Sequence, residues 1–464
     1  MHHQTRVGTR SSAARWLALS VLLTGGFLPP VDFFIVNVAL PSIQSGMAAT
    51  PSQVELVISG YAAGYAVFLV TGGRLGDLYG RKRLFLFGMA GFTAASALSG
   101  LAQSASLLVV ARVLQGTAAA VLVPQVLGSI RALYTSDREL SRALGFYGMM
   151  VGLAAATGQL VSGLLVTWSP LGLGWRSVFL VNLPIGTAAI LGALLVVPET
   201  SAETRPRLDF GGAALLSAML ACLILPLSEG RQKGWPAWIF IMLAATLPLL
   251  WAFLRHEDRV ARRGGMPLLD MSLLSIRSFR RGTIVATLFF FTSPFYLLFA
   301  IERQDGAGLN ALHTGLAILP YGVGLFTGPL ASSPFVDRFG SRLLTFGLTV
   351  QVAGYAATAA AVSLLASPAI LVGTVLLAGF GQGIAMPRLF NTALEHVPPR
   401  QGGVAAGVVS SALQIGAAVS VAAIGTLFFA VLGTASGPAA YAHAFGIAMI
   451  AVVAALAGAA LLSR

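Results

Sequence analysis

Long apolar runs, separated by short polar or charged stretches, fill almost the whole chain of 464 residues. An α-helix needs about 20 apolar residues to cross the hydrocarbon core of a bilayer, and the runs meet that length. The pattern therefore predicts an all-α polytopic membrane protein. Its fourteen expected spans lie near residues 16–40, 54–73, 84–104, 106–131, 142–166, 178–197, 208–227, 236–254, 282–301, 313–335, 342–363, 367–388, 402–431 and 442–462.

The composition excludes several classes of function. Hydrophobic residues make up 56% of the chain and charged residues 10%, whereas about a quarter of an ordinary soluble protein is charged. No room remains for a soluble catalytic domain, so we expect no enzyme. The single cysteine, Cys222, excludes an intrachain disulfide and a cysteine-built metal site. No phosphate-binding loop motif is present. We therefore expect no cofactor and no metal, and an ion or substrate gradient as the energy source.

The formal charge of +13 matters only through its distribution. With the N-terminus inside, 24 of the 29 Lys and Arg residues fall on the cytoplasmic side, where short loops retain basic residues during insertion. This predicts that both termini are cytoplasmic and argues against nucleic-acid binding. The basic N-terminus imitates a secretory signal, but the apolar run continues to Leu40 without a convincing cleavage site, which indicates an uncleaved first span.

An internal repeat divides the chain. The loop Gly73–Arg83 is echoed by Asp337–Arg342, 260 positions later, and the same offset places the first six spans on the last six. We expect an N-terminal six-helix bundle in 1–200, a two-helix insert and linker in 201–275, and a C-terminal bundle in 276–464. Such duplicated halves are typical of transporters that rock about a central site.

Four segments carry a resemblance to a known family. They are the loop Gly73–Arg83, the first-span segment Asp32–Pro41, the fourth-span segment Arg112–Gly116 and the segment Trp175–Pro184. Together they are similar to motifs of the fourteen-helix drug:proton antiporter branch of the major facilitator superfamily, over nearly the whole chain. The resemblance implies a multi-pass protein of the bacterial inner membrane that exports hydrophobic small molecules in exchange for protons.

Asp32 and Arg112 are the candidates for proton coupling. Asp32 is the one acid expected well inside a span, and a buried ionisable residue there points to function. Pro29 and Pro30 precede it, and we expect the helix to bend there. Arg112 is expected roughly 9 Å and Asp32 roughly 13 Å below the outer surface, so the two can meet. The resemblance implies a proton-coupling role for the arginine. The alternatives are a structural Asp and a static buried ion pair.

A conformational latch is expected in the two repeated loops. Glycines there permit tight turns, and an aspartate suits a helix N-terminus or an arginine. The resemblance implies that these residues act as the latch, and the alternative is a basic loop that only fixes orientation. The latch residues are Gly73, Gly76, Asp77, Gly80, Arg81, Asp337, Arg338 and Gly340.

Span five combines small residues with one amide, which favours close helix packing. The packing residues are Gly148, Gly152, Gly158, Gln159 and Gly163. The family pattern has Pro where Gln159 stands and Gly where Ser162 stands, so this export motif is altered. Aromatic and amide side chains of the spans are candidates for a substrate cavity, namely Phe33, Tyr147, Phe291, Tyr321 and Gln414.

We therefore predict a proton-coupled multidrug-type exporter that works by alternating access. Its expected partners are a hydrophobic small molecule, protons and the lipid bilayer, and we expect a monomer. One alternative is an importer or uniporter of the same fold, which the altered span-five motif leaves open. The others are a non-transporting membrane receptor or scaffold, which the intramembrane charges oppose, and a channel, which needs no duplicated halves.

Overall fold

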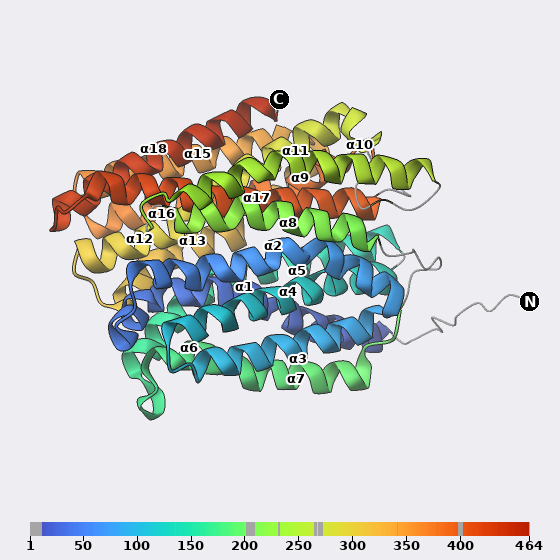
Figure 1. The fold of residues 1–464 in the computed structure, drawn as a ribbon, viewed down its shortest axis with the longest axis horizontal. Coiled ribbons are helices and arrows are strands. Elements are labelled where there is room, and N and C mark those ends of the chain that lie inside the picture. The colour runs from blue at the N-terminus through green and yellow to red at the C-terminus, as the bar shows by residue number, and fades with distance from the viewer. Residues whose placement is uncertain are drawn as a thin grey trace, which may run out of the picture.

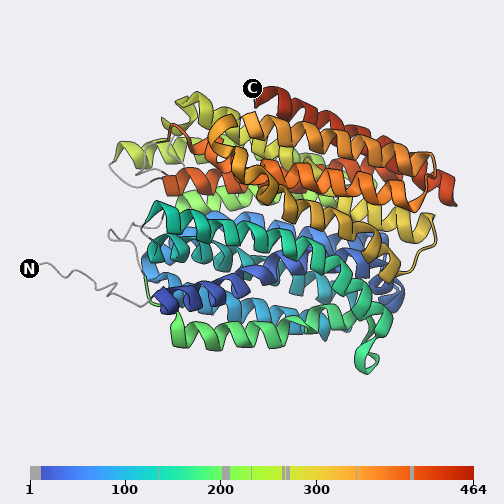
Figure 2. The ribbon, with the colours of Figure 1, turned by 180° about the vertical axis from the view of Figure 1, so that it is seen from behind.

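The computed structural model describes residues 12–134, 136–200, 209–230, 233–263, 267, 272–340, 342–397 and 402–463. Within these ranges every regular element is a helix, as the apolar runs predict. The helices lie side by side in two bundles, one coloured blue to green and one yellow to red (Figure 1). The same two layers are seen from behind (Figure 2).

The first bundle comprises the helices before residue 200. They are α1 (Ser12–Met47), α2 (Pro51–Tyr79), α3 (Arg81–Gly100), α4 (Ala105–Leu133), α5 (Asp137–Trp168), η1 (Pro170–Gly172), η2 (Gly174–Arg176), α6 (Ser177–Leu180) and α7 (Asn182–Val196). Polar residues start several of these helices. Thr50 and Gln53 form a capping box ahead of α2, with the backbone N–H of each bound by the side chain of the other, and Pro51 takes the first helical position.

The remaining helices form the insert and the second bundle. The insert contains α8 (Phe210–Glu229) and α9 (Ala237–Arg262). The second bundle contains α10 (Ser272–Ser275), α11 (Arg277–Phe289), η3 (Phe290–Thr292), α12 (Pro294–Ile301), η4 (Glu302–Gly306), α13 (Ala311–Ser332), η5 (Ser333–Phe335), α14 (Val336–Phe339), α15 (Arg342–Ser363), α16 (Pro368–Leu394), α17 (Gly402–Leu432) and α18 (Pro438–Leu462).

Eleven helices in the described part are long and apolar enough to cross a membrane. Three long helices are not among them: α2 and α8 contain shorter apolar stretches, and α3 begins with the basic sequence Arg81 to Arg83. The insert helix α8 packs against α2 of the first bundle and α17 of the second. Ser217 of α8 donates a hydrogen bond to the Val67 carbonyl of α2, 3.2 Å away.

The two bundles repeat the same close helix contacts. A Cβ atom added at Gly116 of α4 would lie 2.1 Å from the Tyr61 carbonyl oxygen of α2, and one at Gly379 of α16 would lie 2.0 Å from the Tyr321 carbonyl oxygen of α13. Tyr61 and Tyr321 are 260 positions apart in the sequence. The repeat thus extends from the sequence to backbone contacts that only glycine permits.

We expect Gly116→Ala and Gly379→Ala each to destabilise the protein by about 1–3 kcal/mol, because the new methyl group overlaps backbone atoms of a packed helix. Thermal unfolding of the purified protein in detergent measures the effect. Gly145→Ala is the matched control, since a Cβ atom there meets nothing within 4 Å and alanine favours helix. Equal melting temperatures for all three variants and the parent would show that the glycine contacts are unimportant.

We call the surface where the two bundles meet the seam; α5 faces α13 there, α1 faces α12, and α2 faces α17. Gly163 packs against the Ala311 carbonyl near one end of the bundle. Gln304 Nε2 donates to the Val38 carbonyl, 3.3 Å away, near the same end. Val38 lies toward the end of α1, so we call this the far end, opposite the start of that helix. The two bundles are therefore in contact across the seam at the far end.

Candidate functional site

Asp32 lies in the middle of α1, and Arg112 of α4 is ion-paired with it. The helix continues without interruption through Pro29 and Pro30, so the expected bend does not break it. The prolines lack N–H groups, which leaves the Gly25 and Gly26 carbonyls without their usual helical donors. The Tyr61 hydroxyl of α2 donates to the Pro29 carbonyl, 3.1 Å away. Neighbouring side chains thus support the proline segment directly before Asp32.

The Asp32 carboxylate accepts three hydrogen bonds. Arg112 Nη1 donates to Oδ2, while Gln115 Nε2 and Asn182 Nδ2 each donate to Oδ1 at 2.8 Å. Ser96 receives further hydrogen bonds from both amides, at 3.2 and 2.9 Å. All five side chains are buried, with exposed fractions of 0 to 1%. We call these five residues, from four helices of the first bundle, the acid network.

Arg112 has partners besides the carboxylate. Its Nε donates to the Val57 carbonyl at 3.0 Å, and its Nη1 donates to Gln115 Oε1 at 2.8 Å. The guanidinium carbon lies 4.4 Å from the centre of the Tyr61 ring, a cation–π distance. Asp32 thus accepts one charge-assisted hydrogen bond, from Arg112, and two from amide groups. Arg112 also has contacts in the first bundle that do not involve Asp32.

The second bundle has a neutral counterpart. The Tyr321 hydroxyl is hydrogen-bonded to the Tyr355 hydroxyl at 2.7 Å and donates to Gln382 Oε1. Gln351 Nε2 donates to the same oxygen at 3.2 Å. Each of these four side chains is buried, and none is charged near neutral pH. The charge chemistry of the described site therefore belongs to the first bundle.

The loop motif of the first bundle packs tightly. A Cβ atom at Gly76 would overlap the Gln125 side chain, and Gly73 lies against Pro124. Gly80 has φ of +99° between α2 and α3, a conformation that favours glycine. Arg81 Nη1 donates to the Gly128 carbonyl of α4 at 3.0 Å. The side chain of Asp77 lies outside the part that the structure describes.

The second copy of the loop motif is exposed and has few close contacts. The Arg338 side chain is exposed and its guanidinium carbon lies 5.6 Å from the Phe339 ring centre. Gly340 has φ of +48° and nothing within 4 Å of an added Cβ atom. The Asp337 side chain is not among those described. The two loops therefore differ in packing, although their sequences match.

Small residues of α5 allow it to pack closely against helices of both bundles. Gly158 packs against the Val31 carbonyl of α1, while Gly163 and Gly152 pack against α13. Gly148 has no atom near an added Cβ. Gln159 is 1% exposed, and both atoms of its side-chain amide lack a hydrogen-bond partner among the described residues.

The expected cavity residues divide between two core clusters. Phe33 packs against both the larger cluster, which contains residues of both bundles, and the smaller one within the first bundle, whereas Tyr147 packs against the smaller one alone. Phe291 packs against the larger cluster, which contains Tyr321. The Gln414 side chain lies outside the described residues.

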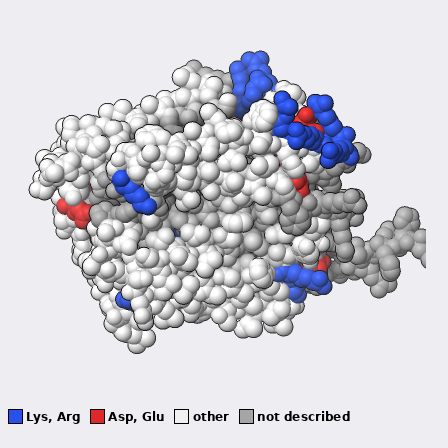
Figure 3. All heavy atoms as spheres, in the orientation of Figure 1, with Lys and Arg blue, Asp and Glu red and all other residues white. Residues whose placement is uncertain are grey.

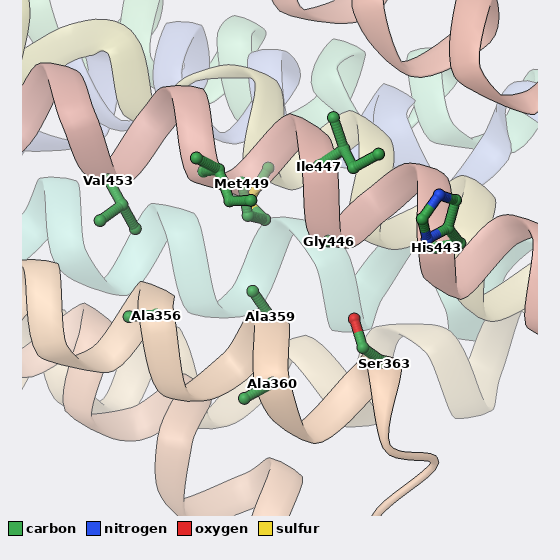
Figure 4. A pocket seen from close by; sticks show the side chains of 10 residues that line it. Ala356, Ala359, Ala360, Ser363, His443, Gly446, Ile447, Met449 and Val453 are labelled. Atoms are coloured by element: carbon green, nitrogen blue, oxygen red, sulfur yellow. The ribbon is translucent and has the colours of Figure 1, made fainter.

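A pocket of about 430 Å³ lies elsewhere, between α15 and α18. Ser363 and His443 lie near one end of it, and small or aliphatic side chains line the rest (Figure 4). It contains no residue of the acid network. Its position therefore does not identify the place where charge and substrate meet.

Sequence reasoning missed part of the network. Gln115 follows Arg112 by three positions and so shares its helix face, which is a usable signal. Asn182 is brought to Asp32 only by the folding of α7 against α1. Glu302, at the start of η4, is 1% exposed beside Arg303. It is a further buried acid besides Asp32, as is Glu257 of α9, and the sequence places it at the edge of a span.

Comparisons with known proteins identify the family. The Major Facilitator Superfamily profile matches residues 22–421. The chain is 40% identical over 435 residues to a probable actinorhodin transporter of Streptomyces coelicolor, covering 93% of this chain and 75% of that protein. It is 30% identical to a tetracenomycin C resistance and export protein of Streptomyces glaucescens, covering 90% and 77%.

The fold is similar to that of a solved structure, tetrameric PepTSo2, with a TM-score of 0.68 and 14% sequence identity over 97% of each chain. At this identity the likeness concerns the fold alone. Taken with the profile match and the relatives, which are named as transporters and exporters, it leads to one conclusion. The chain belongs to the Major Facilitator Superfamily and is a membrane transporter, not an enzyme.

Proposed function

We propose that this protein is a proton-driven exporter of hydrophobic small molecules, with Asp32 as the proton carrier. The observation that carries the proposal is the buried Asp32–Arg112 pair in the middle of the bundle. An ionisable pair inside a membrane protein marks an ion or substrate pathway. The names of the relatives, which refer to transport, resistance and export, support the direction. No bound cofactor is needed, because the proton gradient supplies the energy.

In this proposal the chain crosses the inner membrane of a bacterium with fourteen helices. It is a monomer, and both termini are cytoplasmic. Most Lys and Arg side chains visible on one face gather at the end opposite the far end, where α1 begins (Figure 3). This agrees with the rule that short cytoplasmic loops are rich in basic residues. The far end, where the two bundles are in contact, then faces the periplasm. In this proposal the structure corresponds to a state that is closed to the outside.

The mechanism follows from the partners of Arg112. In the outside-closed state Asp32 is ionised and held by Arg112, Gln115 and Asn182. Opening of the seam exposes the first bundle to the periplasm, where a proton binds Asp32 and Arg112 moves onto its remaining contacts with Val57 and Tyr61. The protonated state releases substrate outside. On return, deprotonation toward the cytoplasm restores the pair and permits the next substrate to bind.

The second candidate is an importer or uniporter of the same fold. Gln159 favours it, because the residue at this position departs from the family's export motif. Gly158 and Gly163, on either side of Gln159, nevertheless pack closely against α1 and α13. This close packing of α5 is what an inward-facing exporter needs where its two bundles meet.

Everted membrane vesicles distinguish the two directions. Energised vesicles containing the protein should accumulate actinorhodin or tetracenomycin C, the compounds that name two relatives, and an uncoupler should abolish the accumulation. Vesicles from cells without the protein are the control. Accumulation in right-side-out vesicles instead would show an importer, and movement that ignores the uncoupler would show a uniporter.

A further inference from the structure

Polar atoms without partners gather beside one aromatic contact in the seam. The ring centres of Phe34 in α1 and Tyr296 in α12 lie 4.8 Å apart, with their planes inclined by 64°. Phe34 belongs to the first bundle and Tyr296 to the second. The two rings therefore part whenever the bundles separate at this point.

The amide of Gln159 and the hydroxyl of Ser162 lie on the α5 side of this contact. Gly158 packs within 3.0 Å of the Phe34 β-carbon, measured from an added Cβ atom, and the carbonyl of the next residue, Gln159, lies against Gly315 of α13. Ser162 is one turn beyond Gly158, on the face of α5 directed to α1. Both side chains are at most 1% exposed. Neither has a hydrogen-bond partner among the described residues.

Tyr296 adds a hydroxyl from the opposite side of the seam. This side chain is 5% exposed, and its hydroxyl lies against the side chains of Tyr321 and Gln382 in the neutral network of the second bundle. Buried polar groups are nearly always satisfied, and an exception calls for an explanation such as a ligand or water that binds there. Gln159 and Ser162 are two such exceptions beside one aromatic pair, and they form a donor and acceptor set without partners among the described residues.

We propose that Phe34 and Tyr296 hold a flat aromatic ring of the substrate between them, and that Gln159 and Ser162 bind hydroxyl or carbonyl groups on that ring. Aromatic faces bind planar ring systems by stacking, and an amide offers both a donor and an acceptor to such substituents. The inference rests on the proposed export function and deepens it by naming a substrate class: planar aromatic molecules that carry oxygen substituents.

Aromatic contacts connect this site to the acid network of the first bundle and to the neutral network around Tyr321 in the second. Successive ring contacts run from Tyr61 to Phe33 at 6.4 Å, then to Phe34 at 5.4 Å, across to Tyr296 and on to Tyr321 at 5.3 Å. Tyr61 lies against Arg112, and Tyr321 is bound to Gln382. Insertion of a ring between Phe34 and Tyr296 therefore displaces Phe34, which is connected to Arg112 through the rings of Phe33 and Tyr61.

Binding to the purified protein in detergent tests the site without any gradient. The probes are alizarin, a planar hydroxylated quinone, and anthracene, which has the same three-ring skeleton without oxygen. Alizarin should bind at least about tenfold more tightly, the difference expected for a hydrogen-bonding site. Gln159→Leu should remove about tenfold of alizarin affinity and leave anthracene unchanged, while raising the melting temperature because an unsatisfied amide is lost.

Phe34→Leu should weaken the binding of both probes, and Ser162→Ala should weaken the binding of alizarin alone. Phe87→Leu is the matched control, since the Phe87 ring is 73% exposed on α3. Alizarin affinity that is unchanged in both Gln159→Leu and Phe34→Leu, or absent in the parent protein, would overturn this site and leave the coupling proposal standing. Conversely, intact binding in a protein that never couples to protons would overturn the export mechanism alone.

Discussion

Asp32→Asn will abolish proton-driven accumulation of substrate while substrate binding stays within a fewfold of the parent. Asparagine keeps the shape of the side chain and still accepts a hydrogen bond from Arg112, but it cannot carry a proton. The structure shows that this carboxylate is fully buried and paired. Loss of coupling without loss of binding is the signature of a proton carrier.

The measurement is transport into proteoliposomes with an imposed pH gradient, beside binding of the same compound in detergent. Accumulation should fall by at least about tenfold, to the level of empty liposomes, because no other described acid lies in the acid network. Glu139→Gln is the control: Glu139 pairs with Arg15, and both side chains are partly exposed. An Asp32→Asn protein that still builds a substrate gradient from the pH difference would show that another group carries the proton.

Arg112→Met will destabilise the protein by about 3–5 kcal/mol, because it leaves the Asp32 carboxylate buried without its cation. The double variant Asp32→Asn with Arg112→Met should recover most of that loss, since neither charge then remains. Thermal unfolding in detergent measures all three proteins. Arg142→Met, at an exposed position on α5, is the matched control and should change stability little.

Additive effects in the Asp32 and Arg112 cycle would contradict this expectation. They would mean that the two side chains contribute independently and that the pair seen in the structure has no energetic coupling. Strong coupling, by contrast, is what a mechanism needs in which Arg112 responds to the charge on Asp32.

The helix pattern and the position of Asp32 were predictable because both depend on local features of the sequence. Apolar run length determines which segments form long membrane-type helices, and a lone acid in such a run is conspicuous. The 260-residue offset between the two halves was likewise visible in the repeated loop sequence. These predictions needed no knowledge of how distant helices pack.

The partners of Asp32 and the contacts in the seam were harder to predict from the sequence. They depend on how each helix is rotated and on contacts between residues far apart in the chain. Asn182 is 150 positions from Asp32, and nothing in its own segment shows which way its amide points. The expected cavity residues were chosen by type alone, and the structure places Tyr147 and Tyr321 in different clusters. Phe34 was overlooked beside Phe33, although it is Phe34 that meets Tyr296 across the seam.

Proton release on substrate binding, recorded with a pH indicator in weakly buffered detergent solution, tests the role of Asp32 most directly. Substrate should displace protons from the parent protein when the starting pH leaves Asp32 partly protonated, and Asp32→Asn should release none while binding the same compound. Identical proton release from the parent and Asp32→Asn would contradict the assignment of this carboxyl group as the carrier.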